Sequence, residues 1–152
     1  MAATLTEPEL IQRLRERGQR VTPQRLILYR ILGELDRHVA AEEVLRAAES
    51  RLPNLSLPTV YATLDLLEEL GAVRRISAPT GAALYDPRAE PHHHLACRQC
   101  GRILDVDGVV DAASLVAAAR ASGAQPETME VVLTGLCPDC APSAASASGP
   151  SG

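Results

Sequence analysis

The fold of this chain is decided by the stretch LPNLSLPTVYATLDLLEELG, residues 52–71. Proline and asparagine near its start are typical of a short turn, and Ser56 is a good N-cap for the helix that follows. Apolar residues on that helix recur at i, i+4 and i+7, the spacing of one buried face, and Gly71 ends the helix. These apolar positions are Val60, Leu64 and Leu67.

Three helices are predicted before this stretch, over Glu7–Arg17, from Pro23 to Leu35, and over Ala40–Ser50. Each carries apolar residues at helical spacing among charged ones, and Thr22 before Pro23 is a strong start signal. The third helix, the turn and the fourth helix together predict a helix-turn-helix.

A small hairpin is predicted after Gly71. Ala72–Ser77 and Ala82–Asp86 have the composition of two short strands, and Pro79-Thr80-Gly81 between them is typical of a turn. Helices followed by such a hairpin predict a winged helix-turn-helix domain over residues 1–86.

The pattern changes beyond residues 87–91, a polar segment bounded by prolines that we expect to be a hinge. Residues 92–140 then predict a small second domain of the α/β kind, so the fold class is α+β. Its expected elements are strand His92–Cys97, strand Arg102–Val106, helix Asp111–Ala121 and strand Glu127–Leu136. Residues 141–152 are small and polar and are expected to be disordered.

The composition limits the functional classes. The chain has 152 residues, a net charge of −4 and 2% aromatic residues, and all 15 basic residues are arginine. A protein this acidic has no global attraction to nucleic acid, so any binding must be local, and stacking platforms for single strands are not expected. The N-terminus lacks a secretory signal, and no apolar run approaches the roughly 20 residues of a membrane span. We therefore expect a cytoplasmic protein that binds no membrane.

All four cysteines lie in two Cys-x-x-Cys pairs, Cys97 with Cys100 and Cys137 with Cys140. In a reducing compartment such pairs favour a structural zinc site with four thiolates. A redox dithiol or an iron–sulfur cluster is the alternative. A redox dithiol usually opens a helix, whereas Cys97 is expected to end a strand.

Histidines precede the first cysteine pair. Because side chains alternate along a strand, His92 and His94 share one face, and we expect His93 to be an exposed bystander. A solvated surface loop is the alternative interpretation of this run. If the two histidines converge with other nitrogen and oxygen donors, the set suits Fe(II), Mn(II) or Ni(II). The candidate regulatory ligands are His38, Asp86, His92, His94 and Asp105. Ligands on both sides of the hinge would let metal occupancy fix the angle between the two domains.

The N-terminal half of the fourth helix, Ser56 to Thr63, is uncharged and would enter the DNA major groove first. Tyr61 lies on the polar side of this helix, and an ordinary amphipathic helix is the alternative. Phosphate contacts are expected from arginines at the first helix and on the wing. The candidate DNA-binding residues are Ser56, Thr59, Tyr61 and Arg20, with Arg13, Arg15, Arg17, Arg74 and Arg75 as further phosphate contacts.

Together these motifs resemble the ferric uptake regulator (Fur) family of metal-dependent repressors. The resemblance covers about residues 8 to 140 and is carried by RVTPQR (20–25), PNLSLPTVY (53–61), HHHLACRQCG (92–101) and CPDC (137–140). It implies a homodimer, a winged helix that binds double-stranded operator DNA, and a C-terminal dimerisation domain with structural zinc. Many relatives have Arg after the tyrosine, where this chain has Ala62, which affects one expected DNA contact.

The resemblance is closest to the peroxide-sensing PerR branch, whose five regulatory-metal positions fall on the candidate ligands above. That branch has Asp at the position of Asp105, whereas iron-sensing members typically have Glu. It implies that Fe(II)-catalysed oxidation by peroxide modifies His38 and His92 and that the repressor then releases DNA, while Mn(II) resists peroxide. Pro91 and Met129 replace histidines of another site that many Fur proteins have. The alternative is an iron- or manganese-responsive repressor of metal uptake genes without peroxide sensing.

Other functions fit less well. A zinc deaminase needs a His-x-Glu with the glutamate as proton shuttle, which the sequence lacks. A non-haem iron oxygenase needs an organic-substrate pocket that so small and aliphatic a chain does not suggest. A zinc-stabilised protein-interaction module is the remaining alternative, and we do not expect an enzyme.

Overall fold

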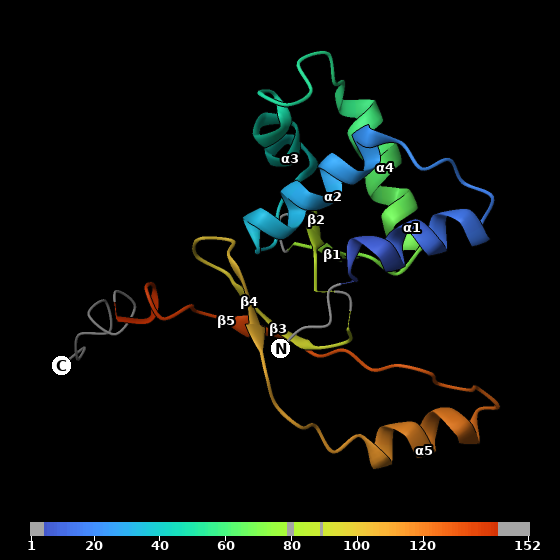
Figure 1. Ribbon diagram of the computed structural model, residues 1–152. Helices are drawn as coiled ribbons and strands as arrows, with labels where there is room; N and C mark the ends of the chain where they lie inside the picture. Colours follow the sequence, from blue (N-terminus) through green and yellow to red (C-terminus); the bar gives the residue numbers. More distant parts are fainter. Residues whose placement is uncertain (1–4, 79–80, 89, 143–152) are drawn as a thin grey trace. The chain divides into compact units, whose positions relative to one another are not determined.

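The computed structural model describes residues 5–78, 81–88 and 90–142. The chain divides into two compact units, unit 1 (Met1–Glu90) and unit 2 (Pro91–Gly152). Figure 1 shows the helices of unit 1 and the small sheet and single labelled helix of unit 2. Pro79 and Thr80 of the predicted turn, Ala89 of the predicted hinge and residues 143–152 of the predicted tail lie outside the described residues, while residues 141–142 are helical.

Unit 1 is a winged helix-turn-helix, as predicted. Its two strands pair antiparallel, with Arg74 opposite Asp86 and Ser77 opposite Ala83. The elements are α1 Glu7–Glu16, α2 Pro23–Leu35, α3 Ala41–Ala48, α4 Leu57–Glu69, β1 Arg74–Ser77 and β2 Ala83–Asp86. Their bounds lie within two residues of the predicted ones, because capping residues and glycines mark the ends locally.

The capping residues act as the sequence predicts. The Thr22 hydroxyl accepts a hydrogen bond from the Arg25 backbone N–H at the start of α2, and Ser56 accepts one from the Thr59 N–H at the start of α4. Each satisfies a backbone donor that has no partner inside its helix. Ser56 therefore fixes where α4 begins.

The core of unit 1 forms around α4. Its apolar stripe, Val60, Leu64 and Leu67, is at most 1% exposed and packs with the buried faces of α1, α2 and α3. Tyr85 of β2 is fully buried in the same cluster. The hairpin is thus attached to the helices through the core, and the buried face of α4 is packed along its length.

Arginines of α1 close the far end of α4. Arg13 Nη1 donates to the Leu70 carbonyl at 2.6 Å, and Arg17 Nη2 donates to the Glu69 carbonyl at 3.4 Å. Gly71 follows with φ +68°, and a Cβ there would lie 3.1 Å from Arg13 Nη1. Cations favour the carbonyl end of a helix, so these two arginines help to hold α1 against α4.

Among the described residues of unit 2, three strands form one sheet in the order β4-β3-β5. β3 (His93–Cys97) lies in the middle, antiparallel to β4 (Ile103–Val106) and parallel to β5 (Val132–Gly135). Helix α5 (Ala113–Ala121) lies in the connection from β4 to β5. β5 is shorter than the predicted strand Glu127–Leu136, because β3 offers pairing partners only from His94 to Cys97.

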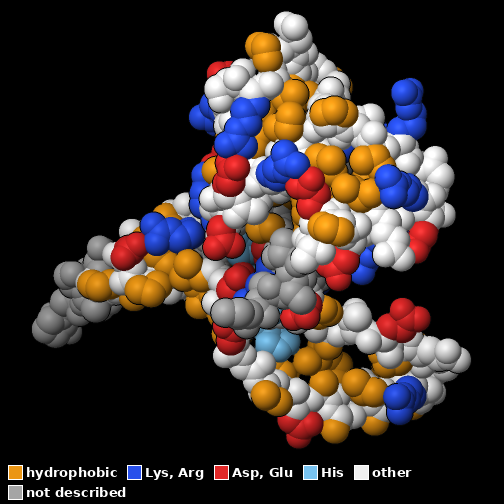
Figure 2. Space-filling view, in the orientation of Figure 1, with side chains coloured by type: hydrophobic (Ala, Val, Ile, Leu, Met, Phe, Trp, Pro, Cys, Tyr) orange, Lys and Arg blue, Asp and Glu red, His pale blue; other side chains and the backbone are white. Residues whose placement is uncertain are grey.

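Unit 2 buries little apolar surface of its own. Helix α5 has no buried residue, and in the part of the chain that the structure describes every exposed large hydrophobic side chain belongs to this unit. These residues are Val109, Val110, Leu115, Val132 and Leu133. Figure 2 shows several apolar side chains, in orange, at the surface of the part of unit 2 that contains α5. Exposed apolar side chains of this kind are typical of a surface that takes part in an interaction.

No helix within the described ranges has the length and apolar character needed to cross a membrane.

Replacing Leu64 with alanine should destabilise unit 1. Leu64 is fully buried at the centre of the α4 stripe, and removing it leaves a cavity that costs about 2 to 5 kcal/mol of unfolding free energy. Urea unfolding followed by helical circular dichroism measures the change. Glu68→Ala on the exposed side of the same helix is the matched control and should leave the midpoint unchanged. Equal effects of the two changes would contradict the assigned core.

Candidate functional site

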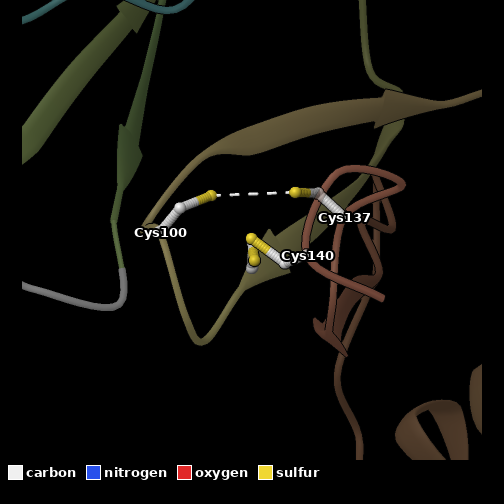
Figure 3. Close-up of side chains that lie close together, drawn as sticks. Cys100, Cys137 and Cys140 are labelled. Atoms are coloured by element: carbon white, nitrogen blue, oxygen red, sulfur yellow. Dashed lines mark hydrogen bonds between the residues drawn. The ribbon is translucent and has the colours of Figure 1, made fainter. Parts of the chain in front are cut away.

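The four cysteines form one cluster in unit 2. Cys97 ends β3 and Cys137 follows β5, and the parallel pairing places Cys97 opposite Gly135, so the two Cys-x-x-Cys turns lie side by side. The four sulfurs lie within 4.8 Å of one another, with Cys100 Sγ 3.7 Å from Cys137 Sγ (Figure 3). Four converging thiols are the donor set of a structural zinc site.

The cluster is built to hold thiolates. Backbone N–H groups of Cys100, Cys137 and Gln99 point at the Cys97 sulfur and lower its pKa to about 6. The pKa of Cys140 is instead raised to about 12, first by hydrogen bonding with Cys137 and then by burial. Four thiolates cannot crowd together without a compensating positive charge, so the arrangement fits a bound cation.

Each cysteine turn is also braced from outside. The Gly101 N–H donates to the Cys97 carbonyl at 2.9 Å, and the Cys140 N–H donates to the Cys137 carbonyl at 3.0 Å. Arg102, just before β4, pairs with Asp139 of the second turn at 2.6 Å. Both sulfur pairs are therefore oriented by backbone hydrogen bonds, and an ion pair links them.

A second donor group in unit 2 has no sulfur. The antiparallel register places His94 directly opposite Asp105, and Asp105 Oδ1 lies 3.0 Å from His92 Nε2 and 3.7 Å from His94 Nε2. The two imidazole rings are 4.4 Å apart between centroids and tilted by 56°. His94 is fully buried and His92 is 6% exposed. One carboxylate therefore faces two buried imidazoles, a sulfur-free donor set that suits divalent iron.

Unit 1 contains a histidine and an aspartate whose side chains also lie close together. His38 Nε2 lies 3.1 Å from Asp86 Oδ2, and these side chains are 10% and 4% exposed. Asp36, in the left-handed region with φ 43°, ends α2 and turns the chain toward His38. Val39 and Tyr85 then exchange two backbone hydrogen bonds of 3.0 and 2.8 Å, which hold the neighbouring His38 and Asp86 together.

The sequence did not indicate two contacts in unit 2. His93 is half-buried and its Nδ1 accepts a hydrogen bond from the Val131 backbone N–H at 3.1 Å, so the expectation that it is exposed is wrong, although it lies outside the group of possible metal donors. Glu130 Oε1 lies 3.0 Å from His94 Nδ1. Both contacts depend on the pairing of β3 with the segment that leads into β5. The spacing of residues along the sequence does not predict this pairing.

The predicted DNA-binding residues lie on and before α4. Ser56 Oγ and Thr59 Oγ1 are 2.8 Å apart, and the half-buried Tyr61 donates its hydroxyl proton to Glu42 Oε1 of α3 at 3.3 Å. Burial and the nearby Glu42 carboxylate raise the pKa of Tyr61. Arg20 and Thr59 line one groove of about 740 Å³. The remaining lining residues are Gly18, Gln19, Thr22, Pro23, Gln24, Arg25, Leu52, Ala62 and Thr63.

Comparison with known proteins identifies relatives of this chain. The model of the ferric uptake regulator family matches residues 16–133. The transcriptional regulator FurA of Mycobacterium tuberculosis (strain H37Rv) is 35% identical over 144 residues, which cover 94% of this chain and 97% of that protein. The peroxide operon regulator of Bacillus subtilis (strain 168) is 30% identical over 134 residues, 87% of this chain and 91% of that protein.

A solved structure has the same fold. The ferric uptake regulator of Helicobacter pylori superposes with a TM-score of 0.76 at 19% identity, covering 93% of this chain and 97% of that one.

Replacing Cys137 with serine should remove the metal of the cysteine cluster. Cys137 is buried between the other sulfurs, and a tetrahedral zinc site loses most of its affinity when one thiolate is missing. Metal analysis of the purified protein should fall from one zinc per chain to a small fraction, with a lower melting temperature. Asp105→Asn, which changes the other donor group, should keep its zinc. An unchanged zinc content in Cys137→Ser would contradict this site.

Proposed function

The chain belongs to the ferric uptake regulator family, whose members are metal-responsive transcription regulators, and we propose that it is a peroxide-sensing repressor. In this proposal a zinc-stabilised homodimer binds operator DNA in the cytoplasm while a regulatory metal is bound. Oxidation of its metal ligands ends repression.

DNA binding is assigned to α4 and the groove beside it. The N-terminal half of α4 carries Ser56 and Thr59 and has no acidic side chain, and Arg20 supplies positive charge to the same groove. A helix N-terminus with hydroxyls and an arginine suits the phosphates and base edges of a major groove. Tyr61 would exchange its bond to Glu42 for a base contact. Ala62 lines the groove at the position where the family resemblance implies an arginine.

Dimerisation is assigned to unit 2. β5 is an edge strand with Val132 and Leu133 about half exposed, and α5 presents Leu115 at 65% exposure. An unpaired strand edge beside uncovered apolar side chains is a surface that a second copy can cover. Two copies would also present two α4 helices, as a two-fold operator requires.

The structural metal is assigned to the cysteine cluster. Zinc fits because the four donors are thiols in closely braced pairs, with no donor position left for a substrate. Since unit 2 buries few apolar residues, the zinc would supply much of its folding free energy.

The regulatory metal is assigned to the two sulfur-free donor groups. His38 and Asp86 from unit 1 would join His92, His94 and Asp105 from unit 2. Three imidazole nitrogens and two carboxylates suit Fe(II) or Mn(II), which prefer harder ligands than zinc in a thiolate site. Because the ligands come from both sides of residues 87–91, binding would fix the angle between the units and so the placement of α4.

Peroxide sensing is supported above all by the position of Asp105. Its Oδ1 lies 3.0 Å from His92 Nε2 and 3.7 Å from His94 Nε2. The family resemblance implies Asp at this position in the peroxide-sensing branch and Glu in typical iron sensors. Bound Fe(II) would supply the electron that reduces peroxide. The resemblance to the peroxide-sensing branch implies that the imidazoles of His38 and His92 gain the oxygen, and a ligand that gains oxygen binds metal poorly. Resemblance to the Bacillus subtilis regulator points the same way.

A repressor that responds to iron or manganese alone is the second candidate. It would use the same ligands and the same DNA surface, and the FurA relative carries no peroxide function in its name. Only the response to peroxide separates the two candidates.

Peroxide should modify the Fe(II)-loaded protein and not the Mn(II)-loaded one. The protein is treated with peroxide in the absence of oxygen and then digested with trypsin. His38 then lies in the peptide that begins after Arg37, and His92 lies in the peptide that begins after Arg88. Mass spectrometry should show a gain of one oxygen at His38 or His92, in parallel with release of operator DNA. His93 in the same peptide as His92 is the internal control. DNA release without any histidine oxidation, or no release at all, would favour the plain metal sensor.

Charge at the edge of β5 should break the dimer. Leu133→Asp puts an anion where Leu133 is 47% exposed on the edge strand, and an apolar interface does not tolerate an unpaired charge. Light scattering after size exclusion should then report the 16.2 kDa monomer. Ala62→Asp in unit 1 adds the same charge and should stay dimeric. A Leu133→Asp protein that remains dimeric with its zinc bound would place the interface elsewhere.

A further inference from the structure

A hydrogen bond between Tyr61 and Glu42 joins the helix assigned to DNA binding to the helix before it. The Tyr61 hydroxyl of α4 donates to Glu42 Oε1 of α3 at 3.3 Å, although the two residues are 19 positions apart in the sequence. The Tyr61 ring is half-buried and packs against the core of unit 1. Because packing holds the ring, this bond decides where the hydroxyl proton points.

Glu42 lies in the first turn of α3 but does not cap that helix. The Glu43 carboxylate accepts a hydrogen bond from the Ala40 backbone N–H at 2.9 Å and pairs with the Arg37 guanidinium at 2.9 Å. For Glu42, the tyrosine hydroxyl is the one hydrogen-bond partner among the described residues. The start of α3 therefore depends on Glu43, while Glu42 acts on Tyr61.

The surroundings of Tyr61 favour its neutral, hydrogen-bonded form. Burial, the Glu42 carboxylate and the hydrogen bond to it all raise the pKa of Tyr61, and the Arg75 guanidinium of β1 acts in the opposite direction. At neutral pH the hydroxyl therefore keeps its proton and donates it to Glu42. A phenol has a single proton, so a hydroxyl that donates to Glu42 cannot also donate to an acceptor on a base edge.

We propose that Glu42 competes with DNA for the Tyr61 hydroxyl and so sets how strongly the protein discriminates between DNA sequences. This role rests on the proposed function, because it requires Tyr61 to contact a base. DNA that is held through phosphates alone leaves the bond between Tyr61 and Glu42 intact. DNA in which Tyr61 donates to a base must break that bond, so Glu42 weakens binding to the operator more than binding to other DNA.

A double-mutant cycle separates this competition from simple charge repulsion. The probe is a duplex selected from a random-sequence pool by the Mn(II)-loaded wild-type protein, with a scrambled duplex of equal length beside it. Glu42→Ala should raise affinity for the selected duplex about 3- to 10-fold more in protein with Tyr61 than in protein with Tyr61→Phe. Repulsion between the Glu42 carboxylate and phosphates would instead raise affinity by one factor in both backgrounds and on both duplexes.

The control removes one negative charge outside unit 1. Glu127→Ala changes an exposed glutamate of unit 2 and should leave the affinity for both duplexes within twofold of wild type. Thermal melting followed by circular dichroism checks that each variant is folded, as the capping bond of Glu43 leads us to expect. Equal gains on the selected duplex in the two Tyr61 backgrounds would overturn the proposal, as would no gain or a loss of affinity.

Carbon-13 NMR of the tyrosines tests the hydrogen bond without DNA. The chain has three tyrosines, so the Tyr61 Cζ resonance can be assigned from its disappearance in Tyr61→Phe. At neutral pH this resonance should shift in Glu42→Ala and stay in place in Glu127→Ala, and an unchanged resonance in Glu42→Ala would overturn the proposal.

The two failures can be told apart. Wild-type protein that selects no duplex would remove the proposed function, even where the resonance shows that Tyr61 is bonded to Glu42. A selected duplex on which Glu42 and Tyr61 show no coupling would remove only the role of Glu42.

Discussion

The pairing of β3 with strands on both of its sides is the interaction on which the candidate sites of unit 2 depend. The antiparallel register with β4 places His94 opposite Asp105, and the parallel register with β5 places Cys97 opposite Gly135, beside the second cysteine turn. A shift of either register by one residue would turn every side chain to the other face. Two donor sets of different chemistry are therefore positioned by one five-residue strand.

This dependence also explains why unit 2 can be so small. Its buried cluster consists of Cys97, Cys137 and Cys140, with Leu104 and Leu136 packed against it. A hydrophobic core of that size stabilises little, whereas a zinc held by four thiolates contributes folding free energy directly. The apolar side chains left on α5 and β5 are then free to serve association between copies. Under the proposed function, metal binding and dimerisation would replace the interior that a larger domain would have.

The parts of the fold that local chemistry determines were predictable from the sequence. Ser56 and Gly71 mark the ends of α4, and Val60, Leu64 and Leu67 mark its buried face, because capping and periodicity act within a few residues. The contacts of His93 and Glu130 were not predictable. They arise from pairing between segments 38 residues apart, and no local sequence pattern predicts which side chains come into contact there. The same holds for Arg13, whose contact with Leu70 joins residues 57 apart. The cysteine cluster was nevertheless foreseeable, since two Cys-x-x-Cys pairs are a spacing typical of a zinc site.

The structure of unit 1 gives the proposed regulatory metal a direct connection to DNA binding. His38 and Asp86 flank Val39 and Tyr85, which exchange two backbone hydrogen bonds. Val39 and Tyr85 are fully buried in the cluster that also contains Val60 and Leu64 of α4. Because a close-packed core transmits displacement instead of absorbing it, a change in the spacing of His38 and Asp86 must be accommodated under α4 itself. Under the proposed function, loss of the metal would therefore act on α4, the helix assigned to DNA binding, from within unit 1.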